Sequence, residues 1–314
     1  MELRPLGFGE IFDRAITLYI RNFLPFAGIV AVVVLPLAIL QYFIDTNSMG
    51  QFDQAIKILT HPTAPPPTTP VMPAFMTDWR VATLFVVTLF IVYAIYPFSL
   101  NAVAIGVARL YTGRPVMFGP CYRGSLHRWP QVLGMLCVEF AIFIAWYIGF
   151  LIIVFLSILV VVLLARAAIA LGIIAGIIAV LIGIAAMLFL APLFVAMTFA
   201  MNSVVIEERP VFASVGLGFS RIFNREEFWR SVLFALAVGA VLLGAGMVAG
   251  IFSTIFLIMH WLPASAIVET LFRAAITPFS IVLLAVYYFD VRIRREGFDL
   301  EAGLERLVES APAT

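Results

Sequence analysis

Few side chains in this sequence could do chemistry, and the clearest is Glu139, which lies within a long apolar stretch. A charged carboxylate in lipid is costly, and intramembrane acids therefore often mark proton-coupling or cation sites. The same group could instead reach the membrane surface, or stay protonated and bonded to a neighbouring helix. Asn101 could bond backbone carbonyls that nearby Pro97 leaves free, or it could contact a substrate.

A second group of residues is basic and lies in the C-terminal third of the chain. It comprises Arg221, Arg225, Arg230, Arg292, Arg294 and Arg295. Arginine clusters beside a membrane attract anionic lipid headgroups, at about 1 kcal/mol per base near the surface. The same arginines could serve topology alone, and both interpretations stay open. Asp290, inside this group, is expected to be a local ion-pair partner.

Catalytic and metal-binding patterns are not found in the sequence. His61, His127 and His260 fall in three separate segments, and Cys121 and Cys137 lack a metal-ligand spacing. We therefore expect no enzymatic activity, no metal and no cofactor. The net charge of +1 gives no reason to expect nucleic acid as a partner.

Composition indicates which elements carry these residues. Hydrophobic residues make up 63% of the 314 residues and charged residues only 12%, against roughly 25% charged in a soluble domain. Lipid must therefore be the solvent for much of the surface. Apolar segments long enough to span a bilayer occur at about 23–44, 81–108, 231–259 and 267–289, and the longer block 131–206 must fold back near Arg166. The sequence predicts an all-α polytopic membrane protein with six transmembrane helices.

The distribution of basic residues predicts the orientation. Most of the 19 lysine and arginine residues lie in the two ends of the chain and after the second and fourth predicted spans. Because basic residues are enriched in cytoplasmic segments, we expect both termini to be cytoplasmic. Lys57 is the one lysine among the 19 basic residues, a bias typical of a GC-rich bacterial genome, so the expected location is a bacterial cytoplasmic (inner) membrane. The segment 45–79, whose middle (61–70) is rich in proline, is then an extracytoplasmic loop, and 296–314 is a cytoplasmic tail with a short amphipathic helix.

Proline and arginine recur at one spacing in the second helix of each predicted pair. The matching residues are Pro97 with Arg114, Pro192 with Arg209, and Pro278 with Arg295. Arg-Pro also opens the chain at residue 4, and a stretch with one apolar and one basic face follows each Arg-Pro, as in interfacial helices. We therefore predict one membrane domain, 1–314, of three tandem helical-hairpin repeats (about 4–113, 114–208 and 209–295), each opening with an amphipathic inner-surface helix.

The two ends of the chain carry a family resemblance. Residues 4–23 read RPLGFGEIFDRAITLYIRNF, and residues 287–301 read YYFDVRIRREGFDLE. They resemble the start and the end of the glycerophosphoryl diester phosphodiesterase membrane-domain family, and the chain is similar, more distantly, to uncharacterised bacterial inner-membrane proteins. The resemblance implies a membrane module, and we expect the membrane region without the soluble phosphodiesterase domain that gives the family its name.

Two functions follow from these features. The first is a non-enzymatic membrane module, an accessory or scaffold in membrane lipid or envelope metabolism, with membrane lipids and a membrane or cytoplasmic protein as partners. The alternative is a transporter or channel for a lipid or small hydrophobic solute, which the parallel repeats, the helix prolines and Glu139 favour. Glycines such as Gly176, Gly183 and Gly246 suit close helix packing or self-association, so a homo-oligomer is compatible with the sequence.

Overall fold

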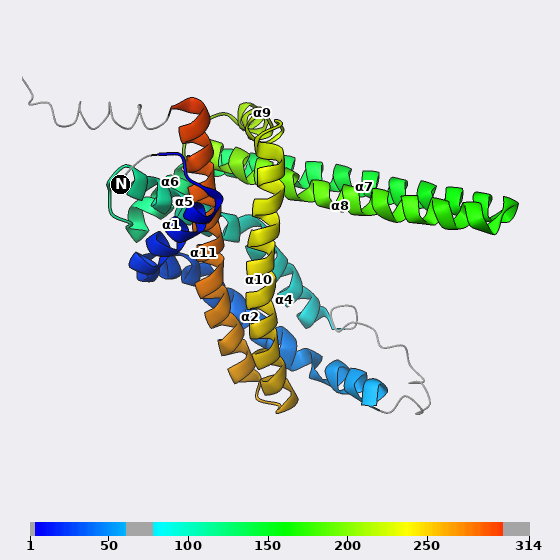
Figure 1. Ribbon diagram of the computed structural model, residues 1–314. Helices are drawn as coiled ribbons and strands as arrows, with labels where there is room; N and C mark the ends of the chain where they lie inside the picture. The colour runs from blue at the N-terminus through cyan, green and yellow to red at the C-terminus, as the bar shows by residue number, and fades with distance from the viewer. Residues whose placement is uncertain (1–3, 61–77, 298–314) are drawn as a thin grey trace, which may run out of the picture. The chain divides into compact units, whose positions relative to one another are not determined.

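The computed structural model describes residues 4–60 and 78–297, and the side chains of all of these except 48–60. Within these ranges every regular element is a helix (Figure 1). The helices are α1 (Phe8–Arg21), α2 (Phe23–Thr60), α4 (Trp79–Phe90), the π-helical η1 (Ile91–Ile95), α5 (Tyr96–Tyr111), α6 (Phe118–His127), α7 (Trp129–Ala167), α8 (Ile169–Val205), α9 (Val211–Ile222), α10 (Glu227–Ile258) and α11 (Leu262–Glu296).

Six helical stretches in the described part of the chain are long and apolar enough to cross a membrane. They are Phe23–Asn47, Trp79–Tyr111, Trp129–Ala167, Ile169–Val205, Glu227–Ile258 and Leu262–Glu296. The chain is therefore an all-α, multi-pass membrane protein, and the six predicted spans are confirmed. α2 continues past the predicted end of the first span, as far as Thr60, so 45–60 is helical. The rest of the predicted loop and the predicted tail helix lie outside the described residues.

The long apolar block folds back at a single residue. Ala168 separates α7 from α8 and has an extended backbone (φ −160°, ψ 135°). Gly172 of α8 approaches Ala165 of α7 so closely that an added Cβ would lie 2.8 Å from the Cα of Ala165. This close approach lets α7 and α8, with 39 and 37 residues, run side by side (Figure 1). The turn lies within two residues of Arg166, where the sequence predicts it.

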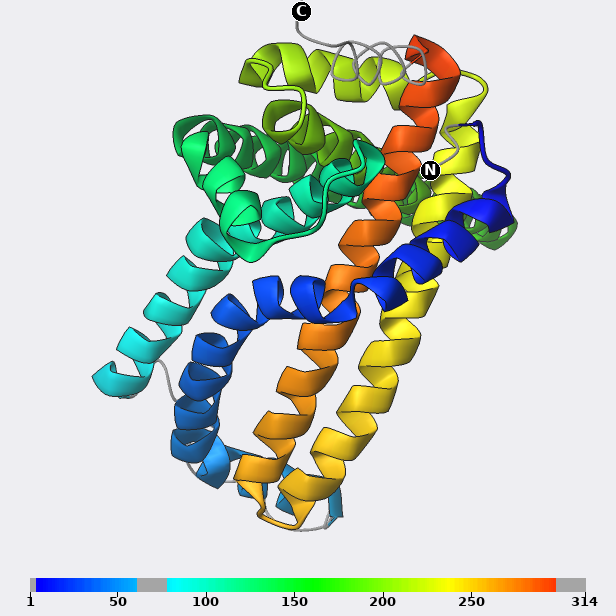
Figure 2. The ribbon, with the colours of Figure 1, turned by 90° about the vertical axis from the view of Figure 1, so that its left-hand side faces the viewer.

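The second span contains the π-helical turn η1 directly before Pro97. Tyr96 donates its backbone N–H to the carbonyl of Ile91, five residues earlier. Pro97, the next residue, has no backbone N–H to donate to the preceding turn, and its ring crowds a carbonyl of that turn. A wider, π-helical turn accommodates both effects. α2 contains Pro36 in its interior and changes direction along its length (Figure 2). Bends of this kind are expected at proline.

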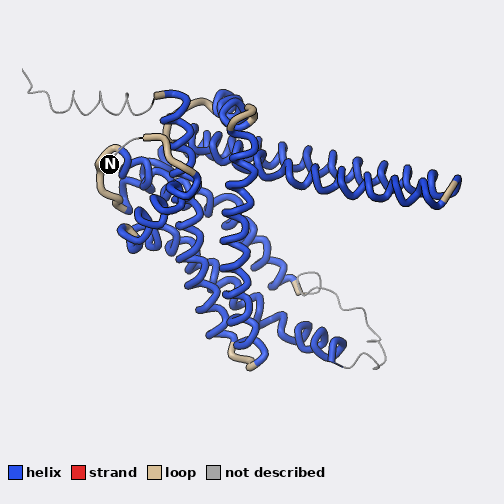
Figure 3. The backbone as a smooth tube through the Cα atoms, viewed as in Figure 1, coloured by secondary structure: helices blue, strands red, loops and turns tan. Residues whose placement is uncertain are grey.

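Two helix ends share one backbone conformation. Gly113 follows α5 with φ +80°, and Glu208 follows α8 with φ +58°. Each is the residue before an Arg-Pro pair, in the short loops that Figure 3 shows between the helices. Glycine adopts positive φ without strain, whereas glutamate does so at a cost. The side chain of Glu208 forms an ion pair with Arg128 (2.8 Å), which helps hold this loop.

The contacts divide the chain into two compact units. The first unit comprises Met1–Ile11, Leu126–Ala240 and Leu284–Thr314. The second unit comprises Phe12–Ser125 and Val241–Leu283. Each unit is built from segments that are distant in sequence. The boundaries between the units fall inside α10 and α11, so each of these two helices contributes to both units.

Each unit has a core of its own. In the first unit the buried ring of Tyr287 lies 4.2 Å from that of Phe234 and 5.4 Å from that of Phe199, measured between ring centroids. In the second unit the ring of Phe26 packs against Gly106, where an added Cβ would lie 2.8 Å from it. These contacts join helices through large apolar side chains that are fully buried.

Candidate functional site

The structure places the two polar residues singled out within spans in different units. Glu139 lies on α7 in the first unit and is half-buried. Among the described residues it forms no hydrogen bond or ion pair. Asn101 lies on α5 in the second unit and is 6% exposed. The role of each side chain stays a prediction.

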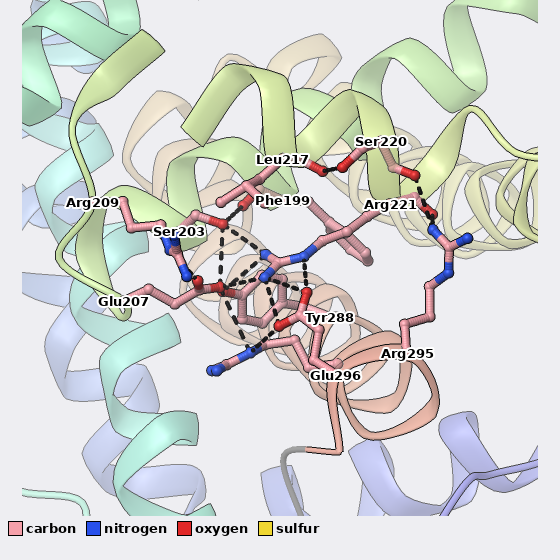
Figure 4. Close-up of polar contacts among 11 residues, drawn as sticks. Phe199, Ser203, Glu207, Arg209, Leu217, Ser220, Arg221, Tyr288, Arg295 and Glu296 are labelled. Atoms are coloured by element: carbon pink, nitrogen blue, oxygen red, sulfur yellow. Dashed lines mark hydrogen bonds and ion pairs between the residues drawn. The ribbon is translucent and has the colours of Figure 1, made fainter. Parts of the chain in front are cut away.

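The first unit holds a buried group of charged and polar side chains (Figure 4). Arg221, on α9, is 3% exposed, and its Nη2 lies 2.8 Å from Glu207 and 2.6 Å from Glu296. Its Nη1 donates to Ser203 Oγ at 2.7 Å. The hydroxyl of Tyr288 donates to Glu207. We call these five residues the Arg221 cluster, and they join α8, the loop after it, α9 and α11.

Glu207 is the carboxylate at the centre of this cluster. Its burial raises its pKa, but the hydrogen bond from Tyr288 and the charges of Arg221 and Arg292 lower it more, so the pKa lies below the ordinary value of 4.5. Arg209 adds a further contact, with its Nε 2.9 Å from Glu207 Oε2. The carboxylate is therefore charged at neutral pH and holds its neighbours in place.

A second buried carboxylate, Asp290 on α11, binds the backbone of the N-terminal segment. Its Oδ1 accepts the backbone N–H of Leu6 at 2.6 Å. Its Oδ2 lies 2.8 Å from Arg230 and 3.0 Å from Arg294, and both arginines also donate to the carbonyl of Leu6. We call these four residues the Asp290 cluster. A carboxylate with three charge-assisted or backbone donors is fully satisfied, although it is 0% exposed.

The remaining arginines of the predicted lipid-binding group are placed as follows. Arg292 lies 3.2 Å from Glu296 and 3.6 Å from Glu207, and Arg295 donates to the carbonyl of Ser220 at 2.9 Å. Arg225 is exposed on the loop between α9 and α10. Most of these arginines thus bind groups of the protein itself, and their contact with anionic lipid stays a prediction.

The second unit contains a cavity of about 120 Å³ between α2, the helix around η1, and α11. Glu269 and Arg273 line it and form an ion pair of 2.5 Å. Gln41 also lines it and donates to Asp45 at 2.7 Å. This group was missed from the sequence, where Asp45 was assigned to a loop. The sequence does carry one signal for this group: Glu269 and Arg273 are opposite charges one helical turn apart in the last span, where charged residues are rare.

Comparison with known protein families shows which family the chain belongs to. Residues 1–291 match the family model described as a domain of unknown function, DUF8558. The chain belongs to the DUF8558 family. No curated protein and no solved structure matches the chain. The DUF8558 match contains Glu207, Arg221 and Asp290, and it ends before Arg292 and Glu296.

The DUF8558 family is described without an activity, so the side chains are the guide to what the chain can bind or catalyse. In the described part of the chain, no group of three or more histidine, cysteine, aspartate or glutamate residues could hold a metal ion. Charged groups in both clusters of the first unit contact one another and the backbone, an arrangement that holds helices together. The cavity of the second unit differs, because its charged groups line an open space.

Proposed function

We propose that this chain is a non-enzymatic integral membrane module, acting as an accessory or scaffold in membrane lipid or envelope metabolism. The observation that carries the proposal is that the buried charged groups of the Arg221 and Asp290 clusters bond other groups of the protein. Arg221, Glu207 and Asp290 are 3%, 5% and 0% exposed and are fully engaged with other protein groups. A catalytic acid or base must reach a substrate. Groups buried in this way support a fixed arrangement of helices instead.

The α7–α8 hairpin supports a role in contacting other membrane components. Between about residues 140 and 190 most of its side chains are apolar and exposed, for example Phe155 at 67% and Val180 at 62%, whereas the last part of α8 is buried. A helix that is apolar on all sides is suited to lipid or to the helices of another membrane protein. The hairpin is therefore the part of the module that we expect to meet its partner.

The proposal includes the orientation and membrane predicted from the sequence: the bacterial inner membrane, with both termini in the cytoplasm. It also includes the amphipathic helices at the inner surface. α1 supports this part, because Ile11, Ala15 and Leu18 are buried on one face while Glu10 and Asp13 are exposed on another. Cysteines introduced beside Arg123 and Arg225 test it. Labelling of both only from the cytoplasmic side is expected, and labelling from the outer side would contradict it.

The proposal also includes three tandem repeats. The helix ends at Gly113 and Glu208 support it, since both have positive φ directly before Arg-Pro. So does the element order, in which the short helices α1, α6 and α9 precede the long helices α2, α7 and α10. The resemblance of the chain ends to the phosphodiesterase membrane-domain family supports a setting beside lipid metabolism.

Site-specific photo-crosslinking in the source cells tests the scaffold function. A photoreactive phenylalanine analogue replaces Phe155 on α7, and a matched variant carries it at Phe212, which is 83% exposed on α9 outside the spans. We expect the Phe155 variant to yield one abundant adduct with a protein of lipid or envelope metabolism, and the Phe212 variant to yield none. Adducts with lipid alone at Phe155 would contradict the proposal.

A second candidate function is a transporter for a lipid or small hydrophobic solute. The cavity of the second unit favours it, because Glu269 and Arg273 place charges at an open space inside a span. Glu139 adds a carboxylate in another span. Flux of a lipid analogue across liposomes that contain the full chain tests this function. Transport that falls in Glu139→Gln would favour it over the scaffold, and absence of flux in the unmodified chain would exclude it.

A further inference from the structure

The cavity of the second unit has the size and lining of a binding site for a small polar group. Its volume of about 120 Å³ corresponds to roughly four water molecules. Its lining includes apolar side chains, such as Val34, Leu37 and Val92, and the polar side chains of Gln41, Glu269 and Arg273. η1 contributes to the wall, and single π-helical turns are frequent at functional sites.

The charges at this cavity are of both signs. Glu269 and Arg273 pair with each other, yet their side chains are 38% and 58% exposed, so both remain within reach of a ligand. Asp45 lies within electrostatic range of both. Glu269 and Arg273 line the cavity, and Asp45 lies beside it as the acceptor of the lining residue Gln41, so two carboxylates and one guanidinium give a net charge of −1. A ligand that is only anionic would meet this excess of negative charge, whereas one that carries both an ammonium and a phosphate offers an opposite charge to the carboxylates and to the guanidinium.

The order of the carboxylate and the guanidinium along α11 favours one arrangement of ammonium and phosphate in the ligand. Glu269 precedes Arg273 by about 6 Å along α11, at 1.5 Å per residue, and lies nearer the turn that joins α10 to α11. Val34 and Leu37 of α2 and Val92 of η1 form an apolar wall of the cavity. From the helix ends toward the middle of the span, the site thus presents carboxylate and then guanidinium, with apolar side chains alongside.

We propose that this cavity binds the phosphoethanolamine headgroup of a phospholipid. The ammonium donates to Glu269 and Asp45, the phosphate accepts from Arg273, and the acyl chains follow the apolar wall. An ammonium has three donors for carboxylates, and guanidinium binds phosphate with two parallel hydrogen bonds. Ammonium and phosphate replace the partners that Glu269 and Arg273 provide to each other, so each of these charged groups keeps a partner of opposite charge. The inference goes beyond the proposed scaffold function and does not depend on it.

Native mass spectrometry of the full chain in detergent tests the site. The probes are phosphatidylethanolamine, phosphatidylcholine and phosphatidylglycerol with the same acyl chains, and free O-phosphoethanolamine. We expect phosphatidylethanolamine to bind at least about tenfold more tightly than the other two lipids, as loss of a charge-assisted hydrogen bond predicts. If free O-phosphoethanolamine binds as tightly as the lipid, the headgroup chemistry is supported but the ligand is a soluble molecule.

The decisive variant exchanges the two charges, Glu269→Arg with Arg273→Glu. It keeps an ion pair one turn apart on α11 and so preserves a purely structural role. We expect it to fold and to lose the preference for phosphatidylethanolamine, whereas Arg166→Gln, at the α7–α8 turn, keeps it. Unchanged binding in the exchanged variant, or equal binding of phosphatidylglycerol to the unmodified chain, would overturn the proposal.

Discussion

Replacement of Arg221 by methionine tests whether the Arg221 cluster stabilises the first unit. The guanidinium contacts Glu207, Glu296 and Ser203 at 2.6–2.8 Å, and both Arg221 and Glu207 are almost fully buried. Removal of one partner from a buried ion pair leaves an uncompensated charge, which costs about 3–5 kcal/mol. Since Glu207 keeps the hydrogen bond from Tyr288 and its contacts with Arg209 and Arg292, we expect the lower end of this range. At roughly 2–4 °C per kcal/mol, the apparent Tm falls by about 6–12 °C.

The assay heats the full chain in detergent and measures the fraction that still elutes as a folded monodisperse species. Arg225→Met is the matched control, because Arg225 is an exposed arginine only a few residues away and should change stability by no more than about 0.5 kcal/mol. The double variant Arg221→Met with Glu207→Gln removes the buried carboxylate that has lost its Arg221 partner and should recover most of the loss. A Tm for Arg221→Met equal to that of Arg225→Met would refute the reasoning, as would a double variant no more stable than the single one.

Three further predictions concern the first unit. The pKa of Glu207 is lowered by folding, so its contribution is present above the unfolded value of about 4.5 and is lost as pH falls through the folded pKa. Acid melts below pH 4.5 should show this loss, and Glu207→Gln should weaken it. Asp290→Asn weakens the attachment of Leu6, so limited trypsin digestion should cleave the N-terminal segment faster than in the unmodified chain. Gly218→Ala should lower the Tm, because the added Cβ meets a backbone carbonyl of α8. Gly216→Ala, where an added Cβ meets open space, should raise the free energy of unfolding by up to about 1 kcal/mol and so raise the Tm.

The spans could be predicted because each rests on local composition. A long apolar block can be satisfied in lipid only as helix, and a block longer than the bilayer must fold back. The turn at Ala168 therefore lies where the sequence places it. The π-helical turn beside Pro97 could not be read in the same way, because a proline permits several responses in the helix and the packing of neighbouring helices selects one.

The clusters could not be predicted, because their members are distant in sequence. Arg221 bonds Glu296 across 75 residues, and Asp290 bonds the backbone of Leu6 across 284. The sequence shows that these arginines are abundant near one end of the spans, but the pairing depends on how helices pack. The sequence predicts Asp290 as a local ion-pair partner of the arginines beside it. That expectation holds for Arg294, one turn away, and the contact with Leu6 has no local signal.

The length of the α7–α8 hairpin has a consequence for the membrane around it. Helices of 39 and 37 residues measure about 55–58 Å, whereas the hydrocarbon layer is about 30 Å thick. To stay within that layer over its whole length, the hairpin would have to tilt by about 60°, well outside the usual range of roughly 0–40°. Hydrophobic mismatch is therefore built into this element. A thicker bilayer reduces the mismatch and a thinner one increases it, so the hairpin makes the energy of the protein depend on the thickness of the membrane that holds it.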